Sequence, residues 1–394
     1  MNFGREEIQE LHKRVGHVTV AYKHLIVVWG GVLFQRYQTN FRNDKTILAE
    51  QIWFYNTLTE LWTLAECTGD VPLGHSGSTG VVCGDFLYLF GGLFGENSEF
   101  KYSNGLYRLN LKTLVWTQLN PTGPAPKKCD KGVGWEYKNK LYFFGGYGEG
   151  PSSLQRNIES TFLLDINNQG FMGWNNQFIC YDPEENAWSI PKVKGVPPNP
   201  RAAHAADIIG HLAFISGGRE GDTRNNDLYC INMETFTWSS NLNSGKESNE
   251  VPGGLSWHSF SFVSPNKAVL YGGLKQYGSP SLEWWECTIS ENNEVSWKVL
   301  PKLMNPLIWH KAAYSKITGE VIIVGGVHDS PYERNEKDCE DKKLVVLAYQ
   351  PISLFRLCLN VIVSDKALQL FADILPKPLM DLVAYRSEQS TYLL

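Results

Sequence analysis

Residues 141–147 of this 394-residue chain read Leu-Tyr-Phe-Phe-Gly-Gly-Tyr, a short apolar run that contains two successive glycines. Aromatic residues are enriched in β-strands, and glycine is favoured where a strand turns sharply or where another backbone comes close. The stretch therefore predicts a buried strand that ends at Gly145 and Gly146.

The same pattern occurs six times along the chain. The glycine doublets begin at residues 30, 91, 145, 217, 272 and 325, so that successive doublets are 61, 54, 72, 55 and 53 residues apart. A unit that recurs at such a period is the signature of a repeat architecture.

A tryptophan follows each of the first five doublets, at Trp62, Trp116, Trp188, Trp238 and Trp297. Tyr55 and Tyr181 stand seven residues before the first and third of these, and Leu109 and Ile231 take the same place before the second and fourth. The combination resembles the kelch repeat, which implies one four-stranded antiparallel blade per unit. We therefore expect an all-β fold, a six-bladed kelch β-propeller, with the tryptophans filling the wedges between blades. A β-sandwich does not account for the periodicity.

The propeller is predicted to span residues 13–350, and its sixth unit is incomplete. Only one clear strand, Lys343 to Tyr349, follows the last doublet. Closure of the ring would then need a strand from the N-terminal segment 1–12, where Glu7 to His12 is the candidate. Residues 351–394 have apolar residues at helical spacing and helix breakers at Pro376 and Pro378, which predicts two or three short helices after the propeller.

Composition and charge exclude several classes of protein. A net charge of −5, from 36 basic and 41 acidic residues, gives no general reason to expect a nucleic acid or an anionic membrane as partner. The N-terminus lacks the apolar core of a secretory signal, and no apolar run is long enough to span a membrane. The eight cysteines are scattered without metal-binding spacing. We expect reduced cysteines in a protein of the nucleus, the cytoplasm or both.

No catalytic motif of the hydrolase, metalloprotease or nucleotide-binding kind occurs in the chain. Four histidines, His17, His204, His258 and His310, stand at equivalent positions before the first strand of a repeat. Such recurrence favours a structural role over metal binding or proton transfer. The prediction is a protein that is not an enzyme and that has no cofactor and no metal site, with a propeller enzyme as the less favoured alternative.

Candidate binding residues lie in loops that a propeller brings to one face, namely those after the doublets and those before the first strand of each blade. They comprise three cations, a hydroxyl and four aromatic residues: Lys131, Arg219, Arg224, Ser256, Tyr147, Trp174, Trp257 and Trp309. Forked arginine donors suit a carboxylate, and aromatic walls exclude water from it. The residues alone leave a second interpretation open, in which the arginines pair with Glu220, Asp222 or Asp227 and the tryptophans are wedge residues.

The stretches GGREGDTRNNDL (217–228), SWHSF (256–260) and QPISLFRLCL (350–359) are similar to the kelch domain-containing protein 1 and 2 family. This family supplies substrate receptors of cullin-2 RING ubiquitin ligases, some of which capture proteins that end in Gly-Gly. The resemblance implies that Arg219, Arg224 and Ser256 hold a terminal carboxylate. It also implies that the other five candidate residues line the pocket.

The chain departs from the family pattern at three places near the expected pocket. Val32 replaces a tyrosine that helps to wall the pocket in the family, and Glu220, Asp222 and Glu149 add acidic groups. These changes preserve carboxylate capture but weaken the expectation of a strict diglycine preference.

The C-terminal helices contain two adaptor motifs. Leu354, Cys358 and Ile362 fall at helical positions i, i+4 and i+8 and fit an elongin-binding box, while Leu375 and Pro376 belong to a stretch that resembles a cullin-2 box. The spacing alone equally allows this stripe to pack against the propeller. The chain is thus predicted to be a substrate receptor that works with elongin B, elongin C, cullin-2 and its RING subunit. The alternative is a kelch scaffold or regulatory protein.

Overall fold

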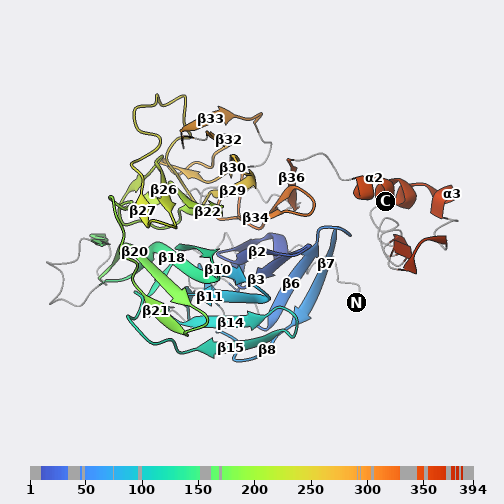
Figure 1. The fold of residues 1–394 in the computed structure, drawn as a ribbon, viewed down its shortest axis with the longest axis horizontal. Helices are drawn as coiled ribbons and strands as arrows, with labels where there is room; N and C mark the ends of the chain where they lie inside the picture. The colour runs from blue at the N-terminus through green and yellow to red at the C-terminus, as the bar shows by residue number, and fades with distance from the viewer. Residues whose placement is uncertain are drawn as a thin grey trace.

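The computed structural model describes residues 10–33, 45–46, 49–73, 75–95, 100–150, 161–167, 171–290, 292, 294–302, 306–328, 344–349, 354–369, 374–377, 379–380 and 383–384. Six antiparallel sheets surround a central axis as the blades of a propeller, in chain order around the ring (Figure 1). The predicted all-β kelch propeller is confirmed.

The first three blades are each built from one continuous part of the chain. Blade 1 consists of β2 (Val18–Tyr22), β3 (Leu25–Trp29), β6 (Gln51–Asn56) and β7 (Leu61–Glu66). Blade 2 consists of β10 (Thr79–Cys83), β11 (Phe86–Phe90), β14 (Leu106–Asn110) and β15 (Val115–Leu119), with β8 (Thr68–Gly69) added in parallel. Blade 3 consists of β17 (Val133–Tyr137), β18 (Lys140–Glu149), β20 (Met172–Asp182) and β21 (Ala187–Ser189).

The last three blades complete the ring. Blade 4 consists of β22 (Ala205–Ile209), β23 (Leu212–Ser216), β26 (Leu228–Asn232) and β27 (Thr237–Trp238). Blade 5 consists of β29 (Ser259–Ser264), β30 (Lys267–Tyr271), β32 (Trp284–Ile289) and β33 (Val295–Val299). Blade 6 consists, among the described residues, of β34 (Lys311–Ser315), β35 (Glu320–Val324) and β36 (Val345–Ala348).

The third blade corrects the prediction that every doublet ends a second strand. β18 continues through Gly145 and Gly146 as far as Glu149, and its register against β20 shifts between Phe144 and Gly146. The ladder between β18 and β20 therefore contains a β-bulge at the doublet, where β20 contributes one residue more than β18.

The spacing between Tyr55 and Trp62 follows from strand pairing. In blades 1 to 4 the residue seven places before the tryptophan is its direct cross-strand partner, as in Tyr55 opposite Trp62 and Leu109 opposite Trp116. In blade 5 the hairpin is longer, and Trp297 pairs with Cys287. Each tryptophan thus occupies the same place on the fourth strand.

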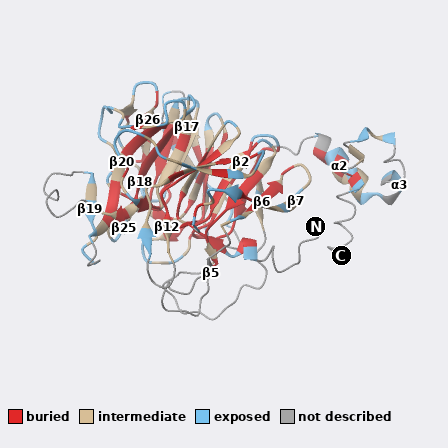
Figure 2. Ribbon diagram, turned by 90° about the horizontal axis from the view of Figure 1, so that it is seen from below, coloured by how far each residue is buried: buried red, intermediate tan, exposed pale blue. Residues whose placement is uncertain are grey.

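These tryptophans pack between blades, as the sequence predicts. Trp116 belongs to a buried cluster shared by blades 1 and 2, Trp188 to the cluster of blades 2 and 3, and Trp238 to that of blades 3 and 4. Partly buried Trp297 and Trp62 pack in the same way at the junctions of blades 4 and 5 and of blades 6 and 1. The core is therefore divided into wedges, and the most deeply buried residues follow the strands (Figure 2).

The strand predicted to close the ring, Glu7 to His12, is described only in part. Residues 10–12 form a helical turn rather than a strand, and Glu7 to Gln9 lie outside the described residues. Leu11 is fully buried in a cluster that also contains Ile26 of blade 1 and Ile322 of blade 6. Hydrophobic burial of Leu11 thus contributes to the junction between the N-terminal residues and the last blade.

Backbone packing explains why the doublets are glycines. Gly272 has a φ of +63°, and a Cβ built there would lie 2.3 Å from the carbonyl oxygen of Leu307 in the next blade. No side chain fits at that separation, and L-residues are strained at that φ.

The described residues after the propeller include the helices α2 (Leu354–Ser364) and α3 (Lys366–Gln369), which confirms the predicted helical segment. They lie beside the propeller rather than within the ring (Figures 1 and 2).

Candidate functional site

One face of the propeller is built from two segments of each blade, the segment before its first strand and the segment at or after its glycine doublet. In every blade the segment before the first strand pairs with the segment at or after the doublet. In blades 1 and 2 the paired segments are β1 (Arg14–Val15) with β4 (Val32–Leu33) and β9 (His75–Ser76) with β12 (Leu93–Phe94). In blades 3 and 5 they are β16 (Cys129–Asp130) with β18 and β28 (Leu255–Ser256) with β31 (Leu274–Lys275). Single bridges join Ala202 to Arg219 and Ile308 to Val327. Further short strands, β5 (Lys45–Thr46), β13 (Lys101–Tyr102), β19 (Phe162–Leu164), β24 (Arg219–Glu220) and β25 (Thr223–Arg224), extend this face.

A ring of six equivalent residues surrounds the mouth of the central channel on this face. All six have left-handed φ values between 55° and 73°: Gly16, Gly77, Lys131, Ala203, Trp257 and Trp309. Backbone N–H groups donate from one blade to the carbonyl of the preceding one, with N···O distances of 2.7 Å for Lys131 to Gly77 and 2.8 Å for Trp257 to Ala203. The left-handed turn brings each chain over the mouth before it enters the first strand.

Trp257 and Trp309 stack on each other at the mouth. Their ring centroids are 5.0 Å apart and the rings are inclined by 18°. They belong to a separate apolar cluster with Val15 and Val32, not to the wedges between blades. Val32 therefore lies within the same apolar wall.

The two arginines lie opposite each other on a short hairpin. Arg219 of β24 pairs in register with Arg224 of β25. Arg224 donates through Nε to the Ser256 hydroxyl at 3.0 Å and through Nη1 to the carbonyl of Gln276 at 3.2 Å. The Gln276 side chain also accepts the Arg224 backbone N–H at 2.6 Å. Ser256, 1% exposed, anchors the charged group at the rim.

The alternative interpretation, in which neighbouring acids pair with these arginines, holds for Asp222, whereas Asp227 and Glu220 have other partners. Asp227 forms a bidentate pair with Arg201, at 2.6 and 2.8 Å. Glu220 accepts hydrogen bonds from the Asn199 side chain. Asp222 contacts Arg219 at 3.5 Å, but its side chain is 83% exposed, so the contact is weak.

Trp174 and Tyr147 form a second aromatic wall on paired strands. Tyr147 lies opposite Trp174 in the ladder of β18 and β20, with ring centroids 5.1 Å apart. The Arg219 guanidinium lies 5.6 Å from the Trp174 ring centroid, and the Tyr147 hydroxyl donates to Asp165 at 2.8 Å. The buried Trp174 ring therefore makes a cation–π contact with the Arg219 guanidinium.

Lys131 is engaged within the protein. Its ammonium forms an ion pair with the buried carboxylate of Asp130, whose pKa is raised by burial against the opposing effect of Lys131. Lys131 also lines a cavity of about 30 Å³ at the mouth together with Trp257 and Trp309.

The eight candidate residues are therefore brought to one face. A continuous series of contacts and strand pairings runs from Tyr147 through Trp174, Arg219, Arg224 and Ser256 to the stacked tryptophans. Sequence reasoning missed Gln276, Asp130 and Asp165. Gln276 follows the fifth doublet, in the same class of loop as the predicted residues, and Asp130 adjoins Lys131, so position in the repeat was a usable signal.

The four recurrent histidines are buried against glycines of the preceding blade. His310 donates to or accepts from the Ser259 hydroxyl at 3.0 Å, and His258 makes the same contact with Ser216 at 3.2 Å. Burial lowers the pKa of His258 to about 4 and that of His310 to about 3, so both are neutral at pH 7. Within the described ranges, no group of three or more His, Cys, Asp or Glu side chains is arranged to hold a metal ion.

Helix α2 presents different residues to the propeller and to solvent. Arg356 forms ion pairs with Glu320 of β35 and with Glu60, and Leu359 is 3% exposed. Leu354 is 77% exposed and Cys358 is also exposed, whereas Ile362 is half-buried. Leu375 is half-buried and Pro376 exposed. The predicted stripe is thus not packed against the propeller at its first two positions.

No helix among the described residues is long and apolar enough to cross a membrane.

Fold and site together define a kelch-repeat propeller with a cationic and aromatic rim at one end of its channel. The kelch-repeats domain described as KLHDC2/KLHL20/DRC7 matches residues 16–273 and 167–326. The chain is 34% identical to bovine kelch domain-containing protein 2 over 379 residues, covering 95% of this chain and 90% of that one. It is also 34% identical to mouse kelch domain-containing protein 1 over 363 residues, covering 89% and 84%. The chain belongs to the kelch domain-containing protein 1 and 2 family.

More distant matches cover a smaller part of the chain. Human host cell factor 2 is 29% identical over 299 residues, which cover 70% of this chain and 33% of that protein. The solved structure of YjhT has a TM-score of 0.57 at 16% identity and covers 80% of this chain, which supports the fold alone. Kelch-repeat propeller families are typically non-catalytic protein-interaction modules.

Proposed function

We propose that the chain is the substrate-recognition subunit of a cullin-2 RING ubiquitin ligase and that its rim captures the C-terminal carboxylate of substrate proteins for ubiquitination and proteasomal degradation. The observation that carries the proposal is the Arg219–Arg224–Ser256 group, in which Asp222 makes one exposed contact with Arg219 while the other two neighbouring acids bind other residues. Asp227 is neutralised by Arg201, and Glu220 is hydrogen-bonded to amides. Both guanidinium groups already donate within the protein, Arg219 to the carbonyl of Gly221 at 2.7 Å and Arg224 to Ser256 and Gln276. A planar guanidinium carries five N–H donors, which suits it to additional contacts with a carboxylate that comes from outside.

The aromatic residues favour a peptide as the molecule that carries this carboxylate. Trp257 and Trp309 offer one flat wall, and Trp174 with Tyr147 offers another. An extended peptide end between such walls loses water, which strengthens its contacts with the arginines. Capture of a free C-terminus by protein donors is a known mode of peptide recognition.

The test is a binding titration of the full chain with C-terminal peptides as free acids and as amides. The first series consists of peptides that end in Gly-Gly. A second series varies the last two residues and measures how strictly the pocket prefers Gly-Gly, a preference that Val32 and the acidic loop residues leave open. Free acids are expected to bind and amides to bind at least tenfold more weakly, since a charge-assisted hydrogen bond contributes about 1.5–3 kcal/mol. Equal affinity for the two forms would sink the carboxylate hypothesis.

Charge-matched variants locate the site. Arg224→Ala is expected to weaken binding of the free acid at least tenfold, because it removes the guanidinium that contacts Ser256. Lys298→Ala removes the same charge from an exposed position of β33 and is expected to leave binding unchanged. If the two variants weaken binding equally, general electrostatic attraction explains the result and the rim is not the site.

The ligase part of the proposal rests on α2. Leu354 and Cys358 are exposed on a helix that Arg356 and Leu359 hold against the propeller. An apolar helix face of this kind can enter the groove of a partner, here elongin C within the elongin B/C–cullin-2 complex. The protein would then work without catalysis of its own, by raising the local concentration of substrate near the conjugating enzyme.

Copurification tests this part independently. Wild type is expected to retain elongin B, elongin C and cullin-2 from nuclear and cytoplasmic extracts, and Leu354→Ser is expected to lose them. Val299→Ser, at a half-exposed position on β33, is the matched control and should retain them. Peptide capture without elongin copurification would favour the alternative, a kelch scaffold that lacks a ligase role.

A further inference from the structure

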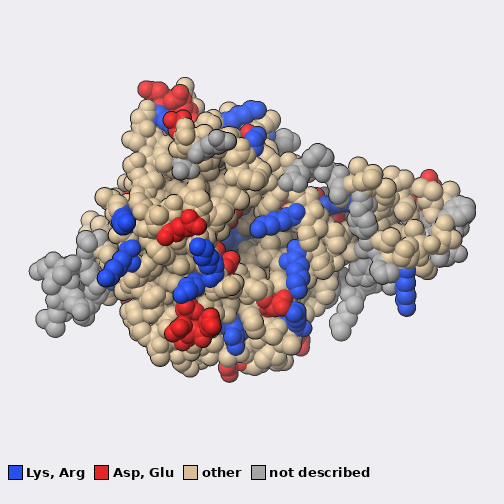
Figure 3. Space-filling view, viewed as in Figure 1, with Lys and Arg blue, Asp and Glu red and all other residues tan. Residues whose placement is uncertain are grey.

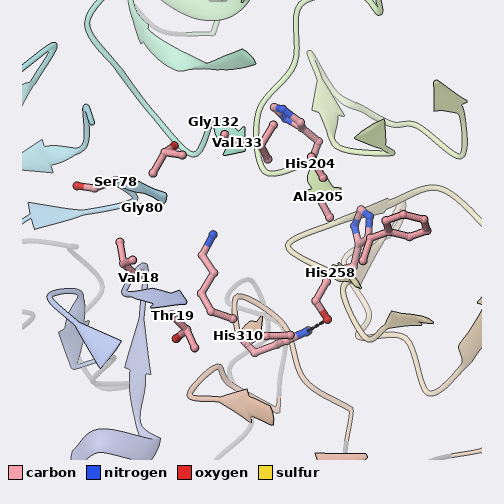
Figure 4. Close-up of a pocket in the computed structure, with 17 residues that line it drawn as sticks. Val18, Thr19, Ser78, Gly80, Gly132, Val133, His204, Ala205, His258 and His310 are labelled. Carbon is pink, nitrogen blue, oxygen red and sulfur yellow. Dashed lines mark hydrogen bonds between the residues drawn. The ribbon is translucent and has the colours of Figure 1, made fainter. Parts of the chain in front are cut away.

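The central channel is lined by sheet edges. The first strands β2, β10, β17, β22, β29 and β34 each stand at the inner end of their blade, with a pairing partner on one side. They surround a cavity of about 200 Å³ (Figure 4). Backbone N–H and C=O groups on the inner edges are therefore directed at the channel rather than into a ladder.

Lys311, the first residue of β34, is the only charged side chain among the residues that line this cavity. The polar side chains beside it include the hydroxyls of Thr19, Ser78, Thr79 and Ser259, and neither aspartate nor glutamate lines the cavity. Within the described part of the chain, Lys311 forms no ion pair. Lys311 is half-buried, and its charged form is disfavoured where it faces the channel without a counter-charge.

The lining of the cavity places Lys311 among residues that come from all six blades. Burial is the main cause that lowers the pKa of His17, His204 and His310, and the charge of Lys311 lowers these pKa values further. Burial also lowers the pKa of Lys311 itself, which an anion beside it would oppose.

Thr19 supplies a second donor from the neighbouring blade. β2 and β34 lie next to each other at the closure of the ring. The Thr19 side chain is 9% exposed, and its hydroxyl has no hydrogen-bond partner among the described residues. A buried hydroxyl without a partner costs stability, so both groups gain from an acceptor in the channel.

An anion can be placed relative to the proposed peptide site. Lys311, His204 and His310 also line the smaller cavity at the mouth, together with Lys131 and Trp257. The channel site therefore lies directly beneath the ring of left-handed residues, whereas Arg219 and Arg224 lie on the rim and line neither cavity.

We propose that the central channel binds a small oxyanion of the phosphate or sulfate class between the Lys311 ammonium, the Thr19 hydroxyl and the inner-edge N–H groups. A tetrahedral oxyanion presents acceptors in several directions at once, which matches donors arranged around an axis. The anion is either inorganic or the phosphate of a small ester, and both forms offer the same group to Lys311.

The experiment titrates inorganic phosphate into the full chain and measures binding by calorimetry and by the shift in thermal unfolding, with sodium chloride at matched ionic strength as the control salt. Adenosine monophosphate in a parallel titration distinguishes a phosphate ester from the free ion. Phosphate is expected to bind and to raise the unfolding temperature, and chloride is not. Absence of phosphate binding, or an equal shift with chloride, overturns the proposal.

Variants place the anion. Lys311→Met keeps the length of the side chain and is expected to lower phosphate affinity at least tenfold. Thr19→Val keeps the shape of Thr19 and is expected to lower it severalfold. Lys316→Met removes the same charge from an exposed turn at the other end of the β34–β35 hairpin and is expected to change nothing.

The outcomes also separate this site from the rim. If Lys311→Met does not fold, the Thr19→Val result decides, and an affinity equal to wild type overturns the proposal. If Arg224→Ala abolishes phosphate binding while Lys311→Met retains it, phosphate occupies the rim and the channel site is wrong. Peptide titrations on the same wild-type protein test the proposed receptor function separately. Peptide binding can be measured even if phosphate does not bind, and phosphate binding can be measured even if the peptides do not bind.

Discussion

The ion pair between Arg201 and Asp227 offers the sharpest test of how the rim is built. The Arg201 side chain is 1% exposed and that of Asp227 is 15% exposed. Besides the bidentate pair, Arg201 donates to the carbonyl of Gly217 at 2.8 Å and to that of Asn199 at 3.0 Å. The pair therefore ties the chain before blade 4 to the doublet that opens the arginine hairpin, and it keeps the Asp227 carboxylate away from that hairpin.

The expected cost of breaking the pair follows from its burial. Removing one partner of a buried ion pair costs about 3–5 kcal/mol, because the other charge is left without compensation. Asp227 retains some contact with solvent, so Arg201→Met is expected to lower the free energy of unfolding by about 3 kcal/mol. Lys140→Met breaks the pair with Asp182, in which the lysine side chain is 48% exposed. That change is expected to cost less than about 1 kcal/mol.

A double-mutant cycle measures the interaction directly. Urea unfolding of Arg201→Met, Asp227→Asn and the double variant should give a double variant that is more stable than the sum of the single changes by about 2 kcal/mol. Peptide binding should fall in Arg201→Met, where the Asp227 charge is released beside Arg219 and Arg224, and recover in the double variant. Additivity within about 0.5 kcal/mol would show that the pair contributes no coupling and would refute this account of the rim.

Three other consequences can be measured in the same protein. Gly272→Ala should destabilise the chain by at least about 1 kcal/mol more than Gly84→Ala, since both residues have φ near +60° but only the Cβ at position 272 meets a carbonyl; equal unfolding energies would contradict the close approach. His258 has a folded pKa of about 4 against an ordinary value of 6.5, so the unfolded chain binds the proton first. Stability should therefore fall as pH drops from about 6.5 to about 4 and the fall should be smaller in His258→Gln; a flat wild-type profile by denaturation would exclude this linkage. Arg356→Met should loosen α2 from β35. The expected result is faster amide hydrogen exchange in residues 354–364 with unchanged exchange in blades 2 to 4. Unaltered exchange in α2 would show that the ion pairs of Arg356 do not hold the helix.

The repeat was readable from the sequence because it depends on local chemistry. A glycine doublet marks a backbone position that tolerates no Cβ, and the seven-residue spacing of Tyr55 and Trp62 is the length of a hairpin that places them opposite each other. The same local rule failed in blade 3, where the strand continues through Gly145 and Gly146. A glycine pair is compatible with continuation of a strand as well as with its end, and here pairing with β16 and β20 continues the strand to Glu149.

The candidate site was predicted as a set of residues but not as a set of interactions. The residues of the site could be predicted from their positions in the repeat, since loops at equivalent places in the blades must meet at one face of the propeller. The sequence did not show which acidic side chains pair with the rim arginines, because Asp227, Glu220 and Asp222 all lie close to Arg219 and Arg224 in the chain. Their partners, Arg201 and Asn199, come from the preceding segment, and Gln276 comes from the next blade.

The sequence by itself determined the number of blades, the wedge tryptophans and the class of residue at the rim, because each of these is set by spacing within one repeat of the chain. Only the tertiary structure decided which charges are neutralised, how residues 10–12 meet the last blade, and that Lys311 stands in the channel without a carboxylate beside it. Those features depend on contacts between blades, where residues far apart in the chain compete for the same partners, and burial decides which pairing has the lower free energy.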